Sequence, residues 1–168
     1  FIKASDSREN LYFGLSVALD GDTLVVGAPY DDTNGTRSGA AYVYERSGST
    51  WTEQAKLFPS NPEAEDFFGH NISLNGDTLA VGVPFENTAG SYSGSVYIFV
   101  RNEGVWSEQA ILQASDADSG DDFGYSVSLD GDTLVVGATG ESTSGSQSGA
   151  AYVFVRTGTI WSEQAILR

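Results

Sequence analysis

The chain repeats itself three times with a period of 55 residues. FGLSVALDGDTLVVGAP begins at Phe13, FGHNISLNGDTLAVGVP at Phe68 and FGYSVSLDGDTLVVGAT at Phe123. Three tryptophans keep the same spacing: Trp51, Trp106 and Trp161. Self-similarity at a period of some tens of residues is typical of propellers and solenoids. We expect the phenylalanines and tryptophans that recur in every unit to be packing residues.

Each unit has the signals of four β-strands. In the first unit, apolar residues alternate with small or polar ones from residue 13 to 19, and Asp20-Gly21 predicts a two-residue hairpin turn before an apolar run at 23–26. A loop rich in Gly, Ser, Asn and Thr leads to a third predicted strand at 40–45 and a fourth at 51–57. The sequence predicts an all-β chain of three four-stranded antiparallel blades, at approximately residues 1–57, 58–112 and 113–168.

The residues at the start and centre of each unit carry a family resemblance. Phe13-Gly14, followed by Gly27-Ala28-Pro29, resembles the FG-GAP repeat of integrin α-subunit propellers and of many bacterial surface proteins. Essentially the whole chain shares the resemblance, although Gly82-Val83-Pro84 and Gly137-Ala138-Thr139 depart from the Gly-Ala-Pro ending. It implies a β-propeller segment of an exported protein, located outside the cell or at its surface, with ligand binding or adhesion as its function.

The calcium loop that often accompanies integrin-type blades has no counterpart here. The corresponding segment, residues 19–23, is too short to wrap a cation, so its carboxylates are predicted to form turns. A weaker candidate is the connector 116–122, where carboxylates surround Gly120 as a Ca²⁺ loop would require. The candidate ligands for calcium are Asp116, Asp118, Asp121 and Asp122. No other cofactor is expected.

The number of units bears on the partners of the chain. A propeller ring closes with about four to eight blades, so three blades are predicted to find a partner. Two chains related by a two-fold axis would make a six-bladed ring, and we therefore expect a homodimer. The alternative is a purely structural, self-assembling propeller fragment, natural or designed, with no ligand other than itself.

The charge of the chain restricts its other partners. There are 23 acidic and 8 basic side chains, giving a formal net charge of -15. Such a surface repels nucleic acid and anionic membranes and favours cations, basic partners or uncharged ligands such as sugars. Acidity can equally serve solubility alone. No apolar run is long enough to span a membrane, so membrane insertion is not expected.

A ligand site is expected on one face of the blades. If the strands alternate in direction, the connectors between blades and the loops between second and third strands emerge together, and these loops are acidic and aromatic. The candidate ligand residues are Tyr30, Asp31, Asp32, Phe85, Glu86, Tyr92 and Glu141. The central channel is a second possible location, and solvated linkers without a ligand are the alternative.

Catalysis is not expected. The single histidine, His70, has no recurring counterpart, and no serine or threonine is placed beside a base. No phosphate-binding loop, zinc spacing or dinucleotide fingerprint is present. The sequence therefore favours a non-catalytic binding or adhesion module for a glycan or a protein ligand.

Overall fold

The computed structural model describes residues 2–6 and 9–168, which form three four-stranded antiparallel sheets. Blade 1 contains β1 (Val17–Asp20), β2 (Thr23–Ala28), β3 (Ala40–Ser47) and β4 (Thr50–Leu57). Blade 2 contains β5 (Asn71–Asn75), β6 (Thr78–Val83), β7 (Ser95–Asn102) and β8 (Val105–Leu112). Blade 3 contains β9 (Phe123–Asp130), β10 (Thr133–Ala138), β11 (Ala150–Thr157) and β12 (Ile160–Leu167). The predicted all-β architecture of three four-stranded blades is confirmed.

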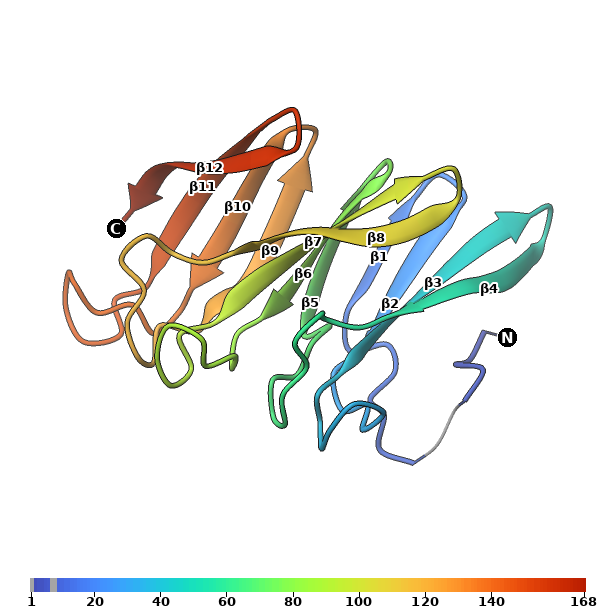
Figure 1. Cartoon of the computed structure of the whole chain (residues 1–168), viewed down its shortest axis with the longest axis horizontal. Coiled ribbons are helices and arrows are strands. Elements are labelled where there is room, and N and C mark those ends of the chain that lie inside the picture. Colours follow the sequence, from blue (N-terminus) through green and yellow to red (C-terminus); the bar gives the residue numbers. More distant parts are fainter. Residues whose placement is uncertain (1, 7–8) are drawn as a thin grey trace.

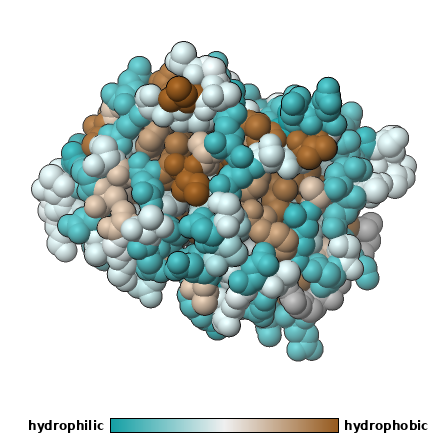
Figure 2. Space-filling model, in the orientation of Figure 1, coloured by the Kyte–Doolittle hydropathy of each residue, from teal (hydrophilic) through white to brown (hydrophobic). Residues whose placement is uncertain are grey.

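The three blades stand side by side in a row, from blade 1 at the right of Figure 1 to blade 3 at the left. The tight hairpins lie at one end of every blade, and we call this end the hairpin rim. The connectors and the loops between second and third strands lie at the opposite end, the loop rim, as the alternation of strand direction predicts. Seen from the side of the outer strands, apolar residues reach the surface in patches among hydrophilic ones (Figure 2).

The first hairpin turn lies one residue later than predicted. Asp20 pairs with Thr23, so the two turn residues are Gly21 and Asp22 rather than Asp20-Gly21. Gly21 has a φ of 57°, as the first central residue of a type II′ turn requires. The shift recurs in blades 2 and 3, where Asn75 pairs with Thr78 and Asp130 with Thr133. The Asp20 carboxylate thereby points along the row and accepts a hydrogen bond of 2.6 Å from the backbone N–H of Gly76 in blade 2.

The core lies between the blades. Phe68 is fully buried and forms edge-to-face contacts with Tyr97 and Phe99, at ring-centroid distances of 5.7 Å and 5.9 Å. These rings pack against blade 1 through residues such as Val25 and Val43. An equivalent cluster joins blades 2 and 3 through Phe123, Tyr152 and Phe154. The phenylalanines that recur in every unit are therefore packing residues, in agreement with the sequence.

On the loop side of the core, the backbones of two neighbouring blades come into direct contact at each junction. Gly39 has a φ of 86°, and a Cβ atom there would lie 2.1 Å from the carbonyl oxygen of Phe68. Only glycine allows this contact. The neighbouring N–H of Phe68 donates to the carbonyl of Ser38 at 3.0 Å. The connector of one blade is thus tied to the loop of the blade before it.

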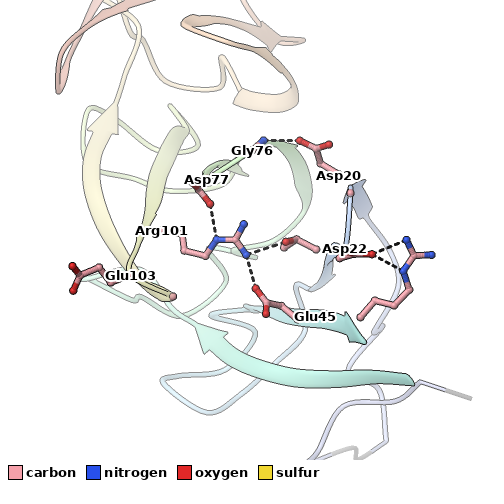
Figure 3. A pocket seen from close by; sticks show the side chains of 11 residues that line it. Asp20, Asp22, Glu45, Gly76, Asp77, Arg101 and Glu103 are labelled. Carbon is pink, nitrogen blue, oxygen red and sulfur yellow. Dashed lines mark hydrogen bonds and ion pairs between the residues drawn. The ribbon is translucent and has the colours of Figure 1, made fainter. Parts of the chain in front are cut away.

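On the hairpin rim, an arginine joins blade 2 to blade 1 (Figure 3). Arg101 donates to Asp77 of its own blade at 2.7 Å, and to Glu45 of blade 1 at 2.6 Å. Its guanidinium also donates to the hydroxyl of Thr23 at 2.9 Å and lies 5.3 Å from the ring of Trp106. The hollow of about 650 Å³ around this group is lined mainly by charged and glycine residues, and Arg101, Asp77 and Glu45 among them already take part in these contacts.

Candidate ligand site on the loop rim

The loop rim is built from two segments that are far apart in sequence. The connector that enters blade 2 runs beside the second-to-third loop of blade 1. The N–H of Glu65 donates to the carbonyl of Thr36 at 2.8 Å, and the N–H of Phe67 donates to that of Arg37 at 3.0 Å. The same pairing recurs between blades 2 and 3. The rim is therefore held by main-chain contacts, which leave its side chains free to vary.

Two positions of this pairing have a left-handed backbone in every unit. Phe67 has a φ of 57°, and its counterparts Tyr12 and Asp122 have 50° and 54°. The second position has values between 51° and 57° and is occupied by different side chains: Arg37, Tyr92 and Gln147. Positive φ is rare for bulky residues. The repeat thus fixes an unusual backbone while the side chain it carries changes from blade to blade.

Five aromatic rings meet on this rim, and we call them the aromatic belt: Tyr12, Tyr30, Phe67, Phe85 and Tyr92. Tyr12 stacks on Tyr30 at 4.3 Å between ring centroids, and Tyr30 meets Phe67 edge to face at 5.0 Å. Phe67 meets Phe85 at 5.4 Å, and Phe85 meets Tyr92 at 5.9 Å. The belt crosses from blade 1 to blade 2 without interruption.

The aromatic belt lines a pocket of about 780 Å³. Leu15, Glu65, His70 and Asp122 complete its wall. The rings of Tyr12 and Tyr92 are half exposed, while Phe67 and Phe85 are partly buried. A concave, mostly apolar site with a few polar groups is the usual form of a ligand pocket.

The polar groups of the pocket are of three kinds. Glu65 forms an ion pair of 3.2 Å with Arg37, whose guanidinium lies 5.5 Å from the centre of the Tyr30 ring. Burial, and then the neighbouring carboxylate of Asp121, raise the pKa of Asp122. Burial lowers the pKa of His70, and the imidazole is therefore neutral at pH 7. Among the described residues, the Nδ1 atom of His70 has no hydrogen-bond partner.

The structure brings together three of the residues that the sequence named as ligand candidates, Tyr30, Phe85 and Tyr92. Asp32 lies beside this pocket in a smaller hollow, and its carboxylate accepts from the N–H of Arg37 at 2.7 Å. Asp31, Glu86 and Glu141 point inward instead and are almost completely buried.

These three buried carboxylates brace the loops of their own blades. Asp31 accepts hydrogen bonds from Thr33, Tyr42 and Lys56, at 2.8 Å, 3.1 Å and 2.8 Å. Burial would raise its pKa, but the bonds from Lys56 and Thr33 lower it to about 2. Similar bonds hold the other two carboxylates, from Ser95 to Glu86 and from Thr143 to Glu141. The partners of Asp31 and Glu86 leave these two carboxylates little capacity for a ligand, whereas the buried Oε2 atom of Glu141 has no hydrogen-bond partner among the described residues.

Two belt residues, Tyr12 and Phe67, were outside the predicted ligand set. The signal that could have identified them is the contrast with their neighbours. Phe13 and Phe68 are constant in the repeat, whereas the residue before each of them changes to Asp122 in the third unit. A position that varies beside one that is constant indicates a side chain that the fold does not need.

The four carboxylates of the predicted calcium loop do not form one group: Asp116, Asp118 and Asp121 line a hollow of about 300 Å³, and Asp122 lies outside it. Asp116 accepts from the hydroxyl of Tyr152 at 2.9 Å and pairs with Arg168. Asp121 accepts from the N–H of Asp118 at 2.8 Å, which is a local turn, whereas Asp122 belongs to the aromatic pocket. Within residues 2–6 and 9–168, no group of three or more His, Cys, Asp or Glu side chains could hold a metal ion. The calcium loop stays a prediction, for which this arrangement offers no preformed group of donors.

Comparison with models of protein families gives a match. A family model described as the FG-GAP repeat matches residues 2–44, 51–99 and 106–154, most of the chain. No curated protein matches the chain at a significant level. In the part of the chain that the structure describes, no helix is long and apolar enough to cross a membrane.

Proposed function

Because the chain belongs to the FG-GAP repeat family, whose propellers are generally non-catalytic and suggest binding or adhesion, we propose that it is a binding module that takes a neutral glycan in the pocket of the aromatic belt. The observation that carries the proposal is the continuous belt of five rings around one pocket. FG-GAP repeats are typical of extracellular domains, which supports a glycan that the chain meets outside the cell or at its surface.

The chemistry of the pocket suits a sugar. A pyranose ring has an apolar C–H face that packs against aromatic rings, and a rim of hydroxyls that require hydrogen-bond partners. Phe67 and Phe85 supply partly buried ring surface. The carboxylates of Glu65 and Asp122 supply acceptors at the edge, and the neutral imidazole of His70 can donate or accept. The volume of about 780 Å³ lies within the range of small-molecule sites.

A protein ligand is the second candidate, and one contact favours it. Arg37 lies over the ring of Tyr30 and pairs with Glu65, so a cation is already accommodated at the edge of the belt. A lysine or arginine of a basic partner could make the same kind of cation–π contact beside Asp122. The net charge of -15 would attract such a partner over a distance of about a Debye length.

An array of neutral and charged glycans, with basic peptides on the same slide, tests the two candidates. The wild-type chain is expected to bind neutral oligosaccharides, and the double variant Phe67→Ala, Phe85→Ala to lose at least about tenfold in affinity, about 1.4 kcal/mol. The control variant Ile160→Ala removes an exposed apolar side chain from the hairpin rim and should bind as the wild type does. The glycan proposal fails if no glycan binds, or if the double variant binds equally well.

A further inference from the structure

The chain has two junctions between blades, and each junction joins two different faces. One copy of each face is left without a partner blade: one on blade 3 and the other on blade 1. The far face of blade 3, at the left of Figure 1, presents the residues that blades 1 and 2 bury. Leu57 and Leu112 are 7% exposed, but their counterpart Leu167 is 58% exposed. Val43 and Ile98 are fully buried, whereas their counterpart in blade 3, Val153, is only partly buried. We call this face the open face: Thr133, Val135, Ala151, Val153 and Leu167.

Blade 1 presents the complementary half at the other end of the row. Leu74 and Leu129 are 9% and 7% exposed where they pack on the blade before them, but Leu19 is 64% exposed. Val17, beside it, is also exposed, although Ile72 at the same repeat position is buried. The N-terminal residues Ile2 and Ala4 cover only the part of this face around Tyr42. We call the remainder the leading face. It consists of Val17 and Leu19, which are exposed, and of Phe13 and Leu24, which are partly buried at its edge.

The polar contacts of the junction are also left incomplete at both ends. Arg101 donates to Thr23, and Arg156 donates to Thr78 at 2.8 Å, which buries both threonines. Thr133, the third of the series, is exposed. Among the described residues, the first arginine, Arg46, forms an ion pair only with Asp22 of its own blade, and it is half exposed, in contrast to Arg101.

The side-chain oxygens that accept at the hairpins, two carboxylates and one amide, follow the same progression. Asp20 accepts from the N–H of Gly76, and Asn75 accepts from that of Gly131 at 3.2 Å. Asp130 is the third acceptor of this series, and the N–H of Gly21 is its matching donor. Acceptor and donor thus stand at opposite ends of the row.

The backbone segment that makes the main-chain hydrogen bonds of a junction already has its docked conformation on blade 1. In the two internal junctions, Phe68 donates to Ser38 and Phe123 donates to Ser93, at 3.0 Å and 3.1 Å. The segment before Phe13 has the same left-handed residues as the docked connectors, with a φ of 62° at Asn10 and 50° at Tyr12. Its backbone is therefore set in the bound conformation, which lowers the entropy cost of docking.

We propose that the leading face docks on the open face of a second copy of this chain, and that two copies close a six-bladed ring through two such junctions. Phe13 then donates to the partner's Ser148, Arg46 to the partner's Thr133, and Gly21 to the partner's Asp130. Ile2 stands at the repeat position of Leu57, so the partner's Leu167 displaces it. A two-fold axis repeats the junction and covers both apolar faces at once. The proposal does not depend on the ligand of the aromatic pocket.

Light scattering after size-exclusion chromatography tests the ring, from about 1 to 100 µM chain. We expect twice the chain mass of 17.8 kDa. Val153→Lys on the open face and Leu19→Lys on the leading face are each expected to raise the dissociation constant at least a hundredfold, because a lysine there is buried without a partner. Val105→Lys is the matched control, since Val105 is exposed on β8 away from both faces.

Circular dichroism and thermal unfolding of the separated single chains check that each variant keeps its fold, since the altered side chains are not fully buried in one copy. A fourth variant, Arg46→Ala, keeps the apolar faces and should weaken the dimer about tenfold. A single-chain mass for the wild type at 100 µM, growth beyond two chains, or a dimer that survives both lysine variants would each overturn the proposal.

Discussion

Phe67 and Phe68 are neighbours in sequence and have opposite roles. Phe68 is fully buried between blades 1 and 2, and its counterparts in the other units are also phenylalanines. Phe67 faces the pocket on the loop rim and is replaced by Asp122 in the third unit. The hairpin rim is constant like Phe68, because its aspartate, arginine and tryptophan recur in every blade. The loop rim varies from blade to blade like Phe67. Constant positions hold the blades together, and varied positions are available for recognition.

Alanine variants of these two neighbours should separate the roles most strongly. Phe68→Ala is expected to lower the free energy of unfolding by about 3 to 5 kcal/mol, because it leaves a cavity between two blades. Phe67→Ala should lower it by about 1 kcal/mol, because its ring is only partly buried. Urea denaturation measures both. Equal losses would remove the distinction between constant and varied positions.

The arginines of the hairpin rim allow the same comparison within one repeat position. Arg101→Ala is expected to cost about 2 to 3 kcal/mol, because it removes charged hydrogen bonds to two blades and leaves Thr23 buried without its donor. Arg46→Ala should cost less than half as much in the single chain, since the described partners of the Arg46 side chain all lie in its own blade. The comparison is made by denaturation at a concentration where both are single chains; similar costs would contradict the account.

We expect a carboxylate on the loop rim to lower the free energy of unfolding as the pH rises, and we expect no such effect from the hairpin rim. Burial raises the pKa of Asp66 from 3.8 to about 6, and its Oδ1 atom has no partner among the described residues. A raised pKa in the folded state means that this group stabilises the fold fully below pH 4, and that this contribution is lost as the pH rises through 6.

Asp66→Asn should therefore be more stable than the wild type at pH 7, by on the order of 1 kcal/mol after the cost of an unpaired amide group. The N–H of Glu63 keeps its acceptor. At pH 3.5 the advantage should vanish. Thermal unfolding across this pH range gives the two curves, and a constant difference between them would show that Asp66 does not titrate as proposed.

Calcium should have the smallest effect. Asp116, Asp118, Asp121 and Asp122 do not form one group, and Arg168 pairs with the first of them. Adding 5 mM CaCl₂ or a chelator is therefore expected to change the melting temperature by less than about 2 °C, under 1 kcal/mol. A larger rise in the melting temperature with calcium, abolished by Asp118→Asn, would show that residues 116–122 bind calcium after all.

The repeat made the fold predictable from the sequence, because spacing and alternation are local signals that the backbone must follow. The hairpin turns were placed one residue early, since Asp20-Gly21 has turn composition but cross-strand pairing places Asp20 opposite Thr23. Local composition identifies a turn better than it fixes the register of the strands that meet there.

The candidate site was only partly predictable, because burial of a loop carboxylate depends on distant partners. Asp31 stands in a polar loop, yet it folds inward onto Tyr42 and Lys56, which lie 11 and 25 residues further along the chain. Nothing local to Asp31 indicates this. Tyr30 and Phe85 were predictable because aromatic residues in a polar loop have no evident packing role in the sequence.

The most direct test is to locate bound ligand on the two rims by NMR. An isotope-labelled sample is titrated with the tightest-binding oligosaccharide from the array, and shifts of backbone amides are mapped. The account predicts that the largest shifts cluster at Tyr12, Tyr30, Phe67, Phe85 and Tyr92. Shifts confined to the hairpin rim, around Gly21, Gly76 and Arg101, would contradict it.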